Sequence, residues 1–345
     1  MLQLTNKSPF QTQIFLFPDP QGIDTLYVVV KATFGLDPHL HIAEKQIPIT
    51  MADEYWGEPG VSSLKYATEV HPAKPGTDIV VIAEACAPQN RPVSEMTVDL
   101  SIAGRTNRLK VSGDRYWKKG LSDVSLSSPR PFLRMPLIYE RAFGGTHMID
   151  KDAGNILAET RNPVGKGFWG KRDKQEPTEV GVPNIEDYRN PIKVPGDNPN
   201  PAGFGCVAPS WQPRLTYAGT YDEAWQKKRA PYLPQNFDPR FFHAAHPDLV
   251  FDKYLKGGEP VSMTNMSPKG KQQFVLPLCD LEINAIVAGQ KNSPQANLET
   301  VLLEPTDERF CMVWRAALPC DKKTLKVNQI DVKLNKININ NRQEG

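Results

Sequence analysis

Segments that are rich in β-branched residues, or that alternate between apolar and polar residues, lie at both ends of the chain. Residues 26–34 (LYVVVKATF) end at a Gly-x-Asp-Pro turn signal, and residues 78–85 (DIVVIAEA) have a similar composition, so both predict strands. Residues 96–102 (MTVDLSI) alternate, residues 104–107 are typical of a turn, and residues 108–113 return as the second arm of a predicted hairpin. The N-terminal part of the chain therefore predicts antiparallel β-structure.

The last third of the chain has the same character. Turns such as EPTDER and PCDKKT separate segments that predict strands, namely residues 272–278, 281–289, 299–305, 309–318 and 324–334. Because strands at both ends enclose an irregular middle, we expect the two halves to complete one β core.

The middle of the chain shows neither the two-residue alternation of a strand nor the 3.6-residue period of a helix. Residues 146–201 are polar and contain repeated Asn-Pro and glycine turn signals, so no regular structure is expected there. Thr220 followed by Glu223 matches a capping box, which predicts a short helix through Arg229. Asp238 followed by Pro239 predicts a second short helix with the aspartate as its N-cap.

These patterns together predict a mainly β fold with antiparallel, sandwich-like sheets, an irregular central lobe rich in proline and aromatic residues, and a few short helices. The expected divisions are an N-terminal β half (1–145), a loop-rich lobe with short helices (146–260) and C-terminal strands that complete the same core (261–334). Residues 335–345 form a tail, which is either flexible or a terminal strand.

Composition and charge restrict the function. The chain has 345 residues, of which 39% are hydrophobic, which is enough for a large core. Its 41 basic and 39 acidic residues are interleaved, so no nucleic-acid partner is expected. No apolar run is long enough for a membrane span, and the N-terminus resembles neither a signal nor an anchor, so no membrane partner is expected. Five scattered cysteines without a CxxC pair fit a reducing cytoplasm better than a disulfide framework.

Motifs that could carry chemistry lack the context they need. The glycines at 165, 167 and 170 match GxGxxG, but Arg161-Asn162-Pro163 precedes them and a charged run leading to Pro177 follows, so a structural loop is expected instead of a dinucleotide site. The histidine pairs 39/41 and 243/246 have no third ligand nearby, so no metal is expected. Neighbouring acids are read as solvated turn residues. The sequence therefore predicts no cofactor and no catalytic residue.

Residues 201–248 are the most informative segment. They contain nine of the thirty aromatic residues of the chain and seven of its 32 prolines, whereas flexible linkers are poor in large rings. Aromatic residues and arginine dominate protein interfaces, so we consider the following residues candidates for partner binding: Trp211, Arg214, Tyr217, Tyr221, Trp225, Tyr232, Phe241 and Phe242. Their rings either anchor irregular backbone to the core or contact a partner.

Residues 139–145 (YERAFGG) combine an aromatic ring, a possible ion pair and two glycines. They predict either a tight structural turn or one wall of a binding groove.

Several segments, in this order, carry a family resemblance. They are residues 62–87 (SSLKYATEVHPAKPGTDIVVIAEACA), YERAFGG, RNPVGKGF, PNIED, PAGFG, the segment from APSWQPRL to FFHAAHPD, and VWRAAL. From about residue 26 to residue 317 the chain resembles the bacterial family known as domain of unknown function 2169. The resemblance implies an adaptor or chaperone that stabilises a type VI secretion effector and helps to load it onto the VgrG and PAAR spike. It implies no catalytic residues.

The leading hypothesis is therefore a non-enzymatic cytoplasmic adaptor whose partners are a secretion effector and spike components. The alternative is a hydrolase or carbohydrate-active β protein with a pocket built from loops, in which Glu140 or Asp222 serves as an acid. A broad apolar groove or patch would favour the adaptor, and a deep cleft with paired acids of perturbed pKa would favour the enzyme.

Overall fold

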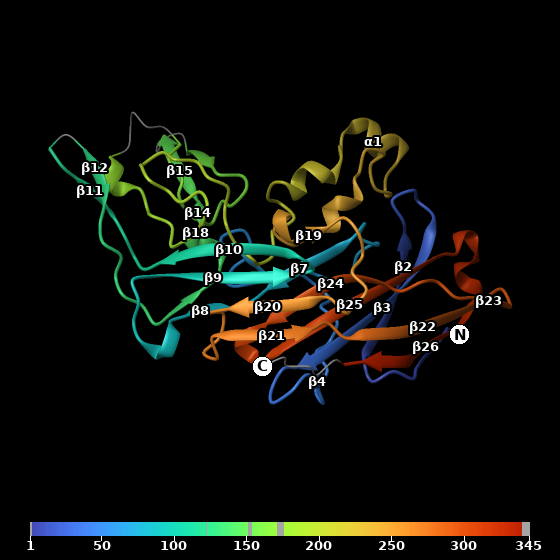
Figure 1. The fold of residues 1–345 in the computed structure, drawn as a ribbon. Helices are drawn as coiled ribbons and strands as arrows, with labels where there is room; N and C mark the ends of the chain where they lie inside the picture. Colours follow the sequence, from blue (N-terminus) through green and yellow to red (C-terminus); the bar gives the residue numbers. More distant parts are fainter. Residues whose placement is uncertain (1, 122, 151–153, 171–175, 340–345) are drawn as a thin grey trace.

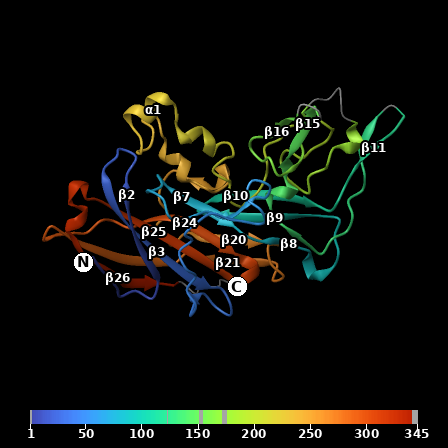
Figure 2. The same cartoon turned by 180° about the vertical axis from the view of Figure 1, so that it is seen from behind.

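Three β-sheets form the body of the molecule, and two lobes stand on the same side of it (Figures 1 and 2). The computed structural model describes residues 2–339 apart from residues 122, 151–153 and 171–175. No helix in these described parts of the chain is long and apolar enough to cross a membrane.

The largest sheet of the described residues has seven strands. In spatial order they are β19 (Val250–Phe251), β7 (Thr77–Val81), β24 (Asn297–Glu304), β25 (Arg309–Pro319), β3 (Asp24–Gly35) and β2 (Gln11–Pro18), with β4 (His41–Ile42) also beside β3. Only β7 and β24 run parallel among these pairs. β3 is buried almost throughout, which explains its continuous β-branched sequence, because a strand covered on both faces has no polar side.

The second sheet is antiparallel. Its order is β18 (Ile185–Asp187), β10 (Arg105–Ser112), β9 (Glu95–Ile102), β20 (Pro260–Thr264) and β21 (Lys271–Val275). The predicted hairpin is present, but its turn is only Ala103 and Gly104, with φ of 48° and 79°. Two positive φ values are typical of the two-residue turn that best fits strand twist, and the second falls on a glycine, which adopts it without strain.

The third sheet pairs strands from both ends of the chain. Its order is β1 (Gln3–Asn6), β26 (Val327–Asn338), β22 (Leu278–Val287) and β23 (Gln290–Asn292), with β1 parallel to β26. β26 continues to Asn338, so the first residues of the expected tail are a terminal strand.

Short paired strands complete the β-structure. The pairs are β5 (Glu54–Tyr55) with β6 (Leu64–Tyr66), β8 (Glu84–Cys86) with β13 (Arg134–Pro136), β11 (Trp117–Lys119) with β12 (Val124–Leu126), β14 (Phe143–Gly144) with β17 (Lys166–Gly167), and β15 (Thr146–Asp150) with β16 (Asn155–Ala158). The expectation of no regular structure in residues 146–201 was wrong, because β15 to β18 lie there. Strands of two to five residues are too short for alternation to show above the surrounding turn residues.

Helices are few and short. The α-helix is α1 (Glu223–Lys228), and the 3-10 turns are η1 (Pro88–Asn90), η2 (Tyr139–Arg141), η3 (Pro177–Glu179), η4 (Arg214–Ala218), η5 (Pro239–Phe242), η6 (Pro247–Leu249), η7 (Pro305–Asp307) and η8 (Asp321–Lys326). The second predicted cap is confirmed, because Asp238 accepts a hydrogen bond from the Arg240 N–H at 2.9 Å.

The predicted capping box at Thr220 was wrong. Asp222 is the N-cap of α1 and accepts from the Trp225 N–H at 2.8 Å. Glu223 begins the helix and pairs with Lys227 one turn later. An aspartate two residues after the threonine competes for the same role, and aspartate is the stronger cap.

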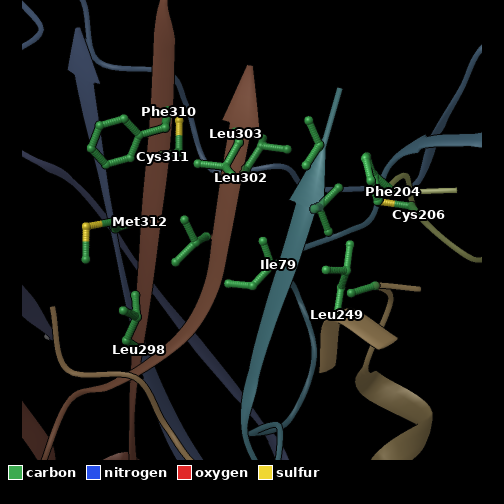
Figure 3. Close-up of a cluster of buried hydrophobic side chains, with 14 of the residues drawn as sticks. Ile79, Phe204, Cys206, Leu249, Leu298, Leu302, Leu303, Phe310, Cys311 and Met312 are labelled. Atoms are coloured by element: carbon green, nitrogen blue, oxygen red, sulfur yellow. The ribbon is translucent and has the colours of Figure 1, made fainter. Parts of the chain in front are cut away.

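One hydrophobic core joins the N-terminal and C-terminal strands. Ile79, Leu303 and Phe310 of β7, β24 and β25 cluster with Phe204 and Leu249 of the middle segment (Figure 3). The predicted fold class, mainly β with mostly antiparallel sheets and short helices, is confirmed.

The two lobes above the sheets come from the middle of the chain. We call residues 113–200 the β lobe; it has a small core of its own around Trp117, Phe143 and Ile192. We call residues 207–249 the helical lobe; it contains α1, η4, η5 and η6 (Figures 1 and 2).

A row of buried charges crosses the outer face of the seven-stranded sheet. Lys31 pairs with Glu69 at 2.8 Å, Arg315 with Glu299 at 2.7 Å, and Lys74 with Asp78 at 2.7 Å. The three basic and three acidic groups balance, and in each pair both side chains are largely buried. Ions removed from water need partners of this kind, because an unpaired buried charge costs several kcal/mol.

Asp78 also holds the helical lobe. Its carboxylate contacts His243 Nδ1 at 2.6 Å and accepts from the Ala244 N–H at 2.8 Å. Burial alone would raise the pKa of Asp78, but Lys74 and His243 outweigh burial and lower it to about 2. The carboxylate is therefore ionised at neutral pH and tethers the lobe to β7.

His71 completes the row as a neutral ring. Burial, together with Arg315 and Lys74 nearby, holds its pKa well below its usual range. Its Nδ1 contacts the Pro72 carbonyl at 2.5 Å and its Nε2 lies 3.3 Å from Arg315 Nη2. This geometry fits a tautomer in which Nδ1–H donates and Nε2 accepts.

We predict that Arg315→Met lowers the free energy of unfolding by about 3–5 kcal/mol, because it leaves Glu299 as an unpaired buried charge. Urea unfolding followed by tryptophan fluorescence measures the change. Lys227→Ala breaks the exposed pair with Glu223 and serves as the control, with an expected loss within about 0.5 kcal/mol. Equal losses in both variants would contradict a buried, partnered Arg315.

We predict that the free energy of unfolding depends on pH through the protonation of His71. Its pKa in the folded protein lies below the unfolded value of 6.5, so its contribution to stability is complete above pH 6.5 and is lost as pH falls below it. One proton taken up on unfolding gives a slope of about 1.4 kcal/mol per pH unit. His71→Gln should remove that part of the slope of unfolding free energy between about pH 6 and pH 5. An unchanged slope would mean that His71 is protonated in the folded protein.

Candidate functional site

A cleft of ≈ 390 Å³ lies between the β lobe and the helical lobe. Its base includes residues 106–109 of β10, and Tyr139, Phe204 and Leu249 contribute buried apolar surface. The β lobe supplies Arg161, Asp187 and Arg189, and the helical lobe supplies Gln212, Pro213 and residues 246–248. The cleft is therefore a product of how the two lobes sit on the second sheet.

A second pocket of ≈ 300 Å³ adjoins the cleft and shares Val207, Pro213 and Pro247 with it. Arg214, Tyr217, Arg240 and His243 also line it. We call these two neighbouring hollows, which share lining residues of the helical lobe, the groove beneath the helical lobe. Grooves of this size between packed units are common binding sites.

Close backbone crossings shape the wall at Tyr139. A Cβ on Gly203 would lie 3.0 Å from the Tyr139 ring, so glycine lets the chain pass directly over that ring. A Cβ on Gly144 would lie 2.0 Å from the Asn162 carbonyl oxygen, and φ of +151° there also favours glycine. The side chain of Asn162 donates to the carbonyls of Tyr139 and Phe143 at 2.8 and 2.9 Å. The residues 139–145 thus form a tight structural feature whose first ring is also a wall of the cleft.

The Tyr139 hydroxyl is a buried polar group without a partner among the described residues. The residue is 4% exposed and lines the cleft, and its ring packs edge-on against Trp211. Burial raises the pKa of this hydroxyl above its usual range, so it stays protonated and can donate. Such orphan groups are rare in folded proteins, and one in a cleft can serve a ligand.

Arginines surround the cleft, and two of them are held in place. Arg108 pairs with Asp99 through Nε and Nη2 at 2.5 and 3.1 Å. Arg161 pairs with Glu159 and also donates to Asn198 and Asn200. The guanidinium of Arg189 has no hydrogen-bond or ion-pair partner within the described part of the chain.

Carboxylates and a histidine face the same cleft. Asp187 accepts from the Arg189 N–H at 2.9 Å, which closes a turn after β18. His246 Nε2 contacts the Pro201 carbonyl at 3.1 Å, and burial lowers its pKa, so the ring is neutral at neutral pH. Asp248 is largely exposed and lies 3.8 Å from His246 Nδ1. The two acids reach the rim from different lobes.

Three of the candidate binding residues anchor the helical lobe. Trp211 is buried against Tyr139, and the ring of Phe242 stacks on His71 at 5.5 Å. Arg214 donates to the carbonyls of Val207 and Phe241 at 2.6 and 3.0 Å.

Of the other candidates, Tyr217, Trp225 and Phe241 are half-buried, and Tyr221 and Tyr232 are exposed. Tyr217 lies beneath the Arg240 guanidinium, and Phe241 beneath that of Arg214. Trp225 packs edge-on against Tyr221 and donates through Nε1 to the Tyr232 carbonyl. Tyr221 and Tyr232 are 53% and 40% exposed, so they are the rings that can meet a partner without unfolding. The anchoring alternative therefore holds for the buried Trp211, and the interface alternative stays a prediction for the exposed Tyr221 and Tyr232.

The loop that contains Gly165, Gly167 and Gly170 takes part in the close backbone crossing at residues 142–145. β17 (Lys166–Gly167) pairs in parallel with β14, and a Cβ on Gly165 would lie 2.7 Å from the Ala142 carbonyl oxygen. The loop follows no strand of the kind that a dinucleotide fold requires. Part of the charged run after it, residues 171–175, lies outside the described residues.

The histidine pairs serve local contacts. His41 Nδ1 contacts the His39 carbonyl, while His243 pairs with Asp78 and His246 with Pro201. No group of three or more histidine, cysteine, aspartate and glutamate side chains in the described residues could hold a metal ion.

The sequence pointed to Tyr139, in the segment 139–145, as a possible groove wall, but it did not indicate the other residues that build the cleft. Arg108 and Arg189 stand in polar surroundings without a motif, and Asn162 and Gly203 act through backbone contacts that only the fold creates. Two motifs of the sequence, YERAFGG and PAGFG, could have indicated the wall at Tyr139. In each of them glycines are next to large rings, which indicates close packing of backbone on aromatic faces.

The fold and the site define a β-rich protein with two lobes and a cleft between them. The chain belongs to the family described as "Uncharacterized protein conserved in bacteria (DUF2169)", whose model matches residues 21–315. This match includes both lobes and every residue that lines the cleft. Neither the curated proteins nor the solved structures contain a match to the chain.

We predict that Arg214→Ala lowers the free energy of unfolding by about 2–3 kcal/mol, since hydrogen bonds from a charged donor are each worth about 1.5–3 kcal/mol. Tyr221→Ala removes an exposed ring and should cost no more than about 1 kcal/mol. Urea unfolding of the two variants makes the comparison. A larger loss for Tyr221→Ala would reverse the assignment of anchor and surface residue.

Proposed function

We propose that the chain is a non-enzymatic adaptor that binds a type VI secretion effector in the cytoplasm and promotes its stability and its loading onto the VgrG and PAAR spike. The groove beneath the helical lobe carries this proposal. Its two neighbouring hollows of ≈ 390 and ≈ 300 Å³ share lining residues and combine apolar walls with an arginine-rich rim. Concave surface of this mixed character suits a polypeptide better than a small substrate.

Glu140 and Asp222, the acids that the hydrolase alternative would use, have structural roles in this fold. Both oxygens of Glu140 accept hydrogen bonds from Ser63, one from its N–H and one from its hydroxyl, each at 2.7 Å. Asp222 caps α1. A general acid must be free to reach the reacting bond, so these assignments favour binding over hydrolysis.

The partner and the compartment in this proposal come from the family resemblance. The accessible Tyr221 and Tyr232, with Arg229 beside the Tyr232 ring, add surface of the type that is enriched at protein interfaces. The five cysteines are free thiols, which is compatible with a reducing compartment.

The experiment is affinity capture of the tagged chain from the bacterium that encodes it, with mass spectrometry of the proteins that co-purify. The proposal expects a secretion effector or a spike component in stoichiometric yield. If neither is recovered under conditions that keep the tagged chain folded, the adaptor function is wrong.

We predict that Tyr221→Ala combined with Tyr232→Ala weakens capture of the effector at least about tenfold, which is 1.4 kcal/mol, because interface tyrosines often carry more than that. The matched control is Tyr116→Ala, which removes a ring of the β lobe that is 56% exposed. Titration of the purified effector gives the dissociation constants, and circular dichroism checks the fold. Equal binding by the double variant and the control would show that Tyr221 and Tyr232 do not extend the interface beyond the groove.

A further inference from the structure

The edge of the second sheet is open inside the cleft. β9 covers one side of β10 from Arg105 to Ser112. On the other side, β18 pairs only with the residues from Leu109 to Val111. The chain then turns away at Asp187, where the Asn190 N–H bonds back to the Asp187 carbonyl at 3.1 Å. The first half of β10 is therefore left without a second neighbour among the described strands.

The hydrogen-bond pattern shows which backbone groups face this edge. The Ser112 N–H donates to the Asn184 carbonyl, and the Arg108 carbonyl accepts a long bond of 3.4 Å from the Tyr188 N–H, so both residues point away from β9. In an antiparallel pair this direction alternates along the strand. Thr106, two residues before Arg108, therefore directs its N–H and its carbonyl to the open edge.

This edge lies in the cleft, because residues 106–108 line it. Open strand edges invite pairing with other chains, and proteins usually block them. Residues of both lobes flank the edge, so we expect it to admit a single extended segment more readily than a second folded sheet. The shape therefore selects an extended polypeptide as the occupant.

We propose that the cleft binds an extended segment of the effector as an added strand, antiparallel to β10 and paired through the N–H and carbonyl of Thr106. This inference rests on the proposed adaptor function and specifies how that function recognises its partner. Strand addition of this type obtains affinity from main-chain bonds and specificity from alternating side chains.

The two faces of the cleft indicate the composition of the segment. Side chains on the same side as Leu109 meet the apolar surface of Phe204 and Leu249. Arg108 lies on the opposite face of β10, and the guanidinium of Arg189, which has no partner among the described residues, also lines the cleft. We therefore expect alternating apolar and acidic residues, with a polar group placed to accept from the orphan Tyr139 hydroxyl.

Thr106→Pro is the variant that tests this pairing. It removes the N–H that faces the open edge and leaves the bonds between β9 and β10 in place, since proline is tolerated at such edge positions. Thr106→Ala removes the side chain and keeps the N–H. Gln273→Pro is the matched control on β21 at the far edge of the same sheet. Gln273 lies opposite Ser262 in a non-hydrogen-bonded pair of the antiparallel ladder, so its N–H points away from β20 and, like that of Thr106, faces an open edge.

The probe is the effector that co-purifies with the wild-type chain, identified by mass and then produced separately. We expect Thr106→Pro to raise the dissociation constant at least about tenfold, and Thr106→Ala and Gln273→Pro to bind as the wild type does. In the wild-type complex, hydrogen–deuterium exchange at the Thr106 amide should slow at least about tenfold relative to the free chain. The exchange measurement needs no variant, so it decides the matter if Thr106→Pro does not fold.

Unchanged affinity of Thr106→Pro, or unchanged exchange at Thr106 in a saturated complex, would overturn strand addition while the adaptor function stands. Failure of the wild-type chain to bind any effector is a different result, and it would contradict the proposed function itself.

Discussion

The carboxylate of Asp78 is the contact on which the arrangement of the cleft depends. It lies on β7, is fully buried, and binds Lys74, His243 and the Ala244 N–H together. Lys74 in turn donates its own N–H to Glu299, which pairs with Arg315. One network thus joins the seven-stranded sheet, the segment before β7 and the helical lobe. Well-packed apolar residues can be as stable as buried ion pairs, so we infer that the charges mainly fix where the lobe sits.

The walls of the cleft are irregular segments whose buried backbone carbonyls need hydrogen-bond donors. Asn162 and Asn184 are fully buried, and their side-chain amides donate to backbone carbonyls that no strand neighbour reaches. Gly144 and Gly203 allow chains to cross at distances that a Cβ would prevent. These contacts hold the β lobe rigidly beside β10, and they leave the first half of that strand uncovered. The open edge is therefore a consequence of a well-packed lobe, since β18 ends where its chain must turn.

The sequence was sufficient for the regular parts of the fold, because burial imposes period and composition on long strands. Residues 26–34 and 310–316 are buried throughout, and their β-branched and aromatic content shows it. The row of buried charges is also visible in the sequence, because Lys31 and Arg315 interrupt otherwise apolar strands. Charges at such positions are buried and therefore need partners of opposite charge. The cleft could not be predicted, because it depends on which irregular segments meet. Tyr139, Arg108 and His246 are distant in sequence, and only the docking of the lobes brings them to one site. Likewise, composition alone could not separate the anchoring Trp211 from the exposed Tyr221.

Binding of the partner in the cleft between the lobes can be tested by an experimental structure of the chain bound to its effector, at a resolution that traces both main chains. We expect an extended effector segment beside residues 105–108, between the β lobe and the helical lobe. An effector seated on another surface, with the cleft free of its chain, would show that the cleft is not the binding site.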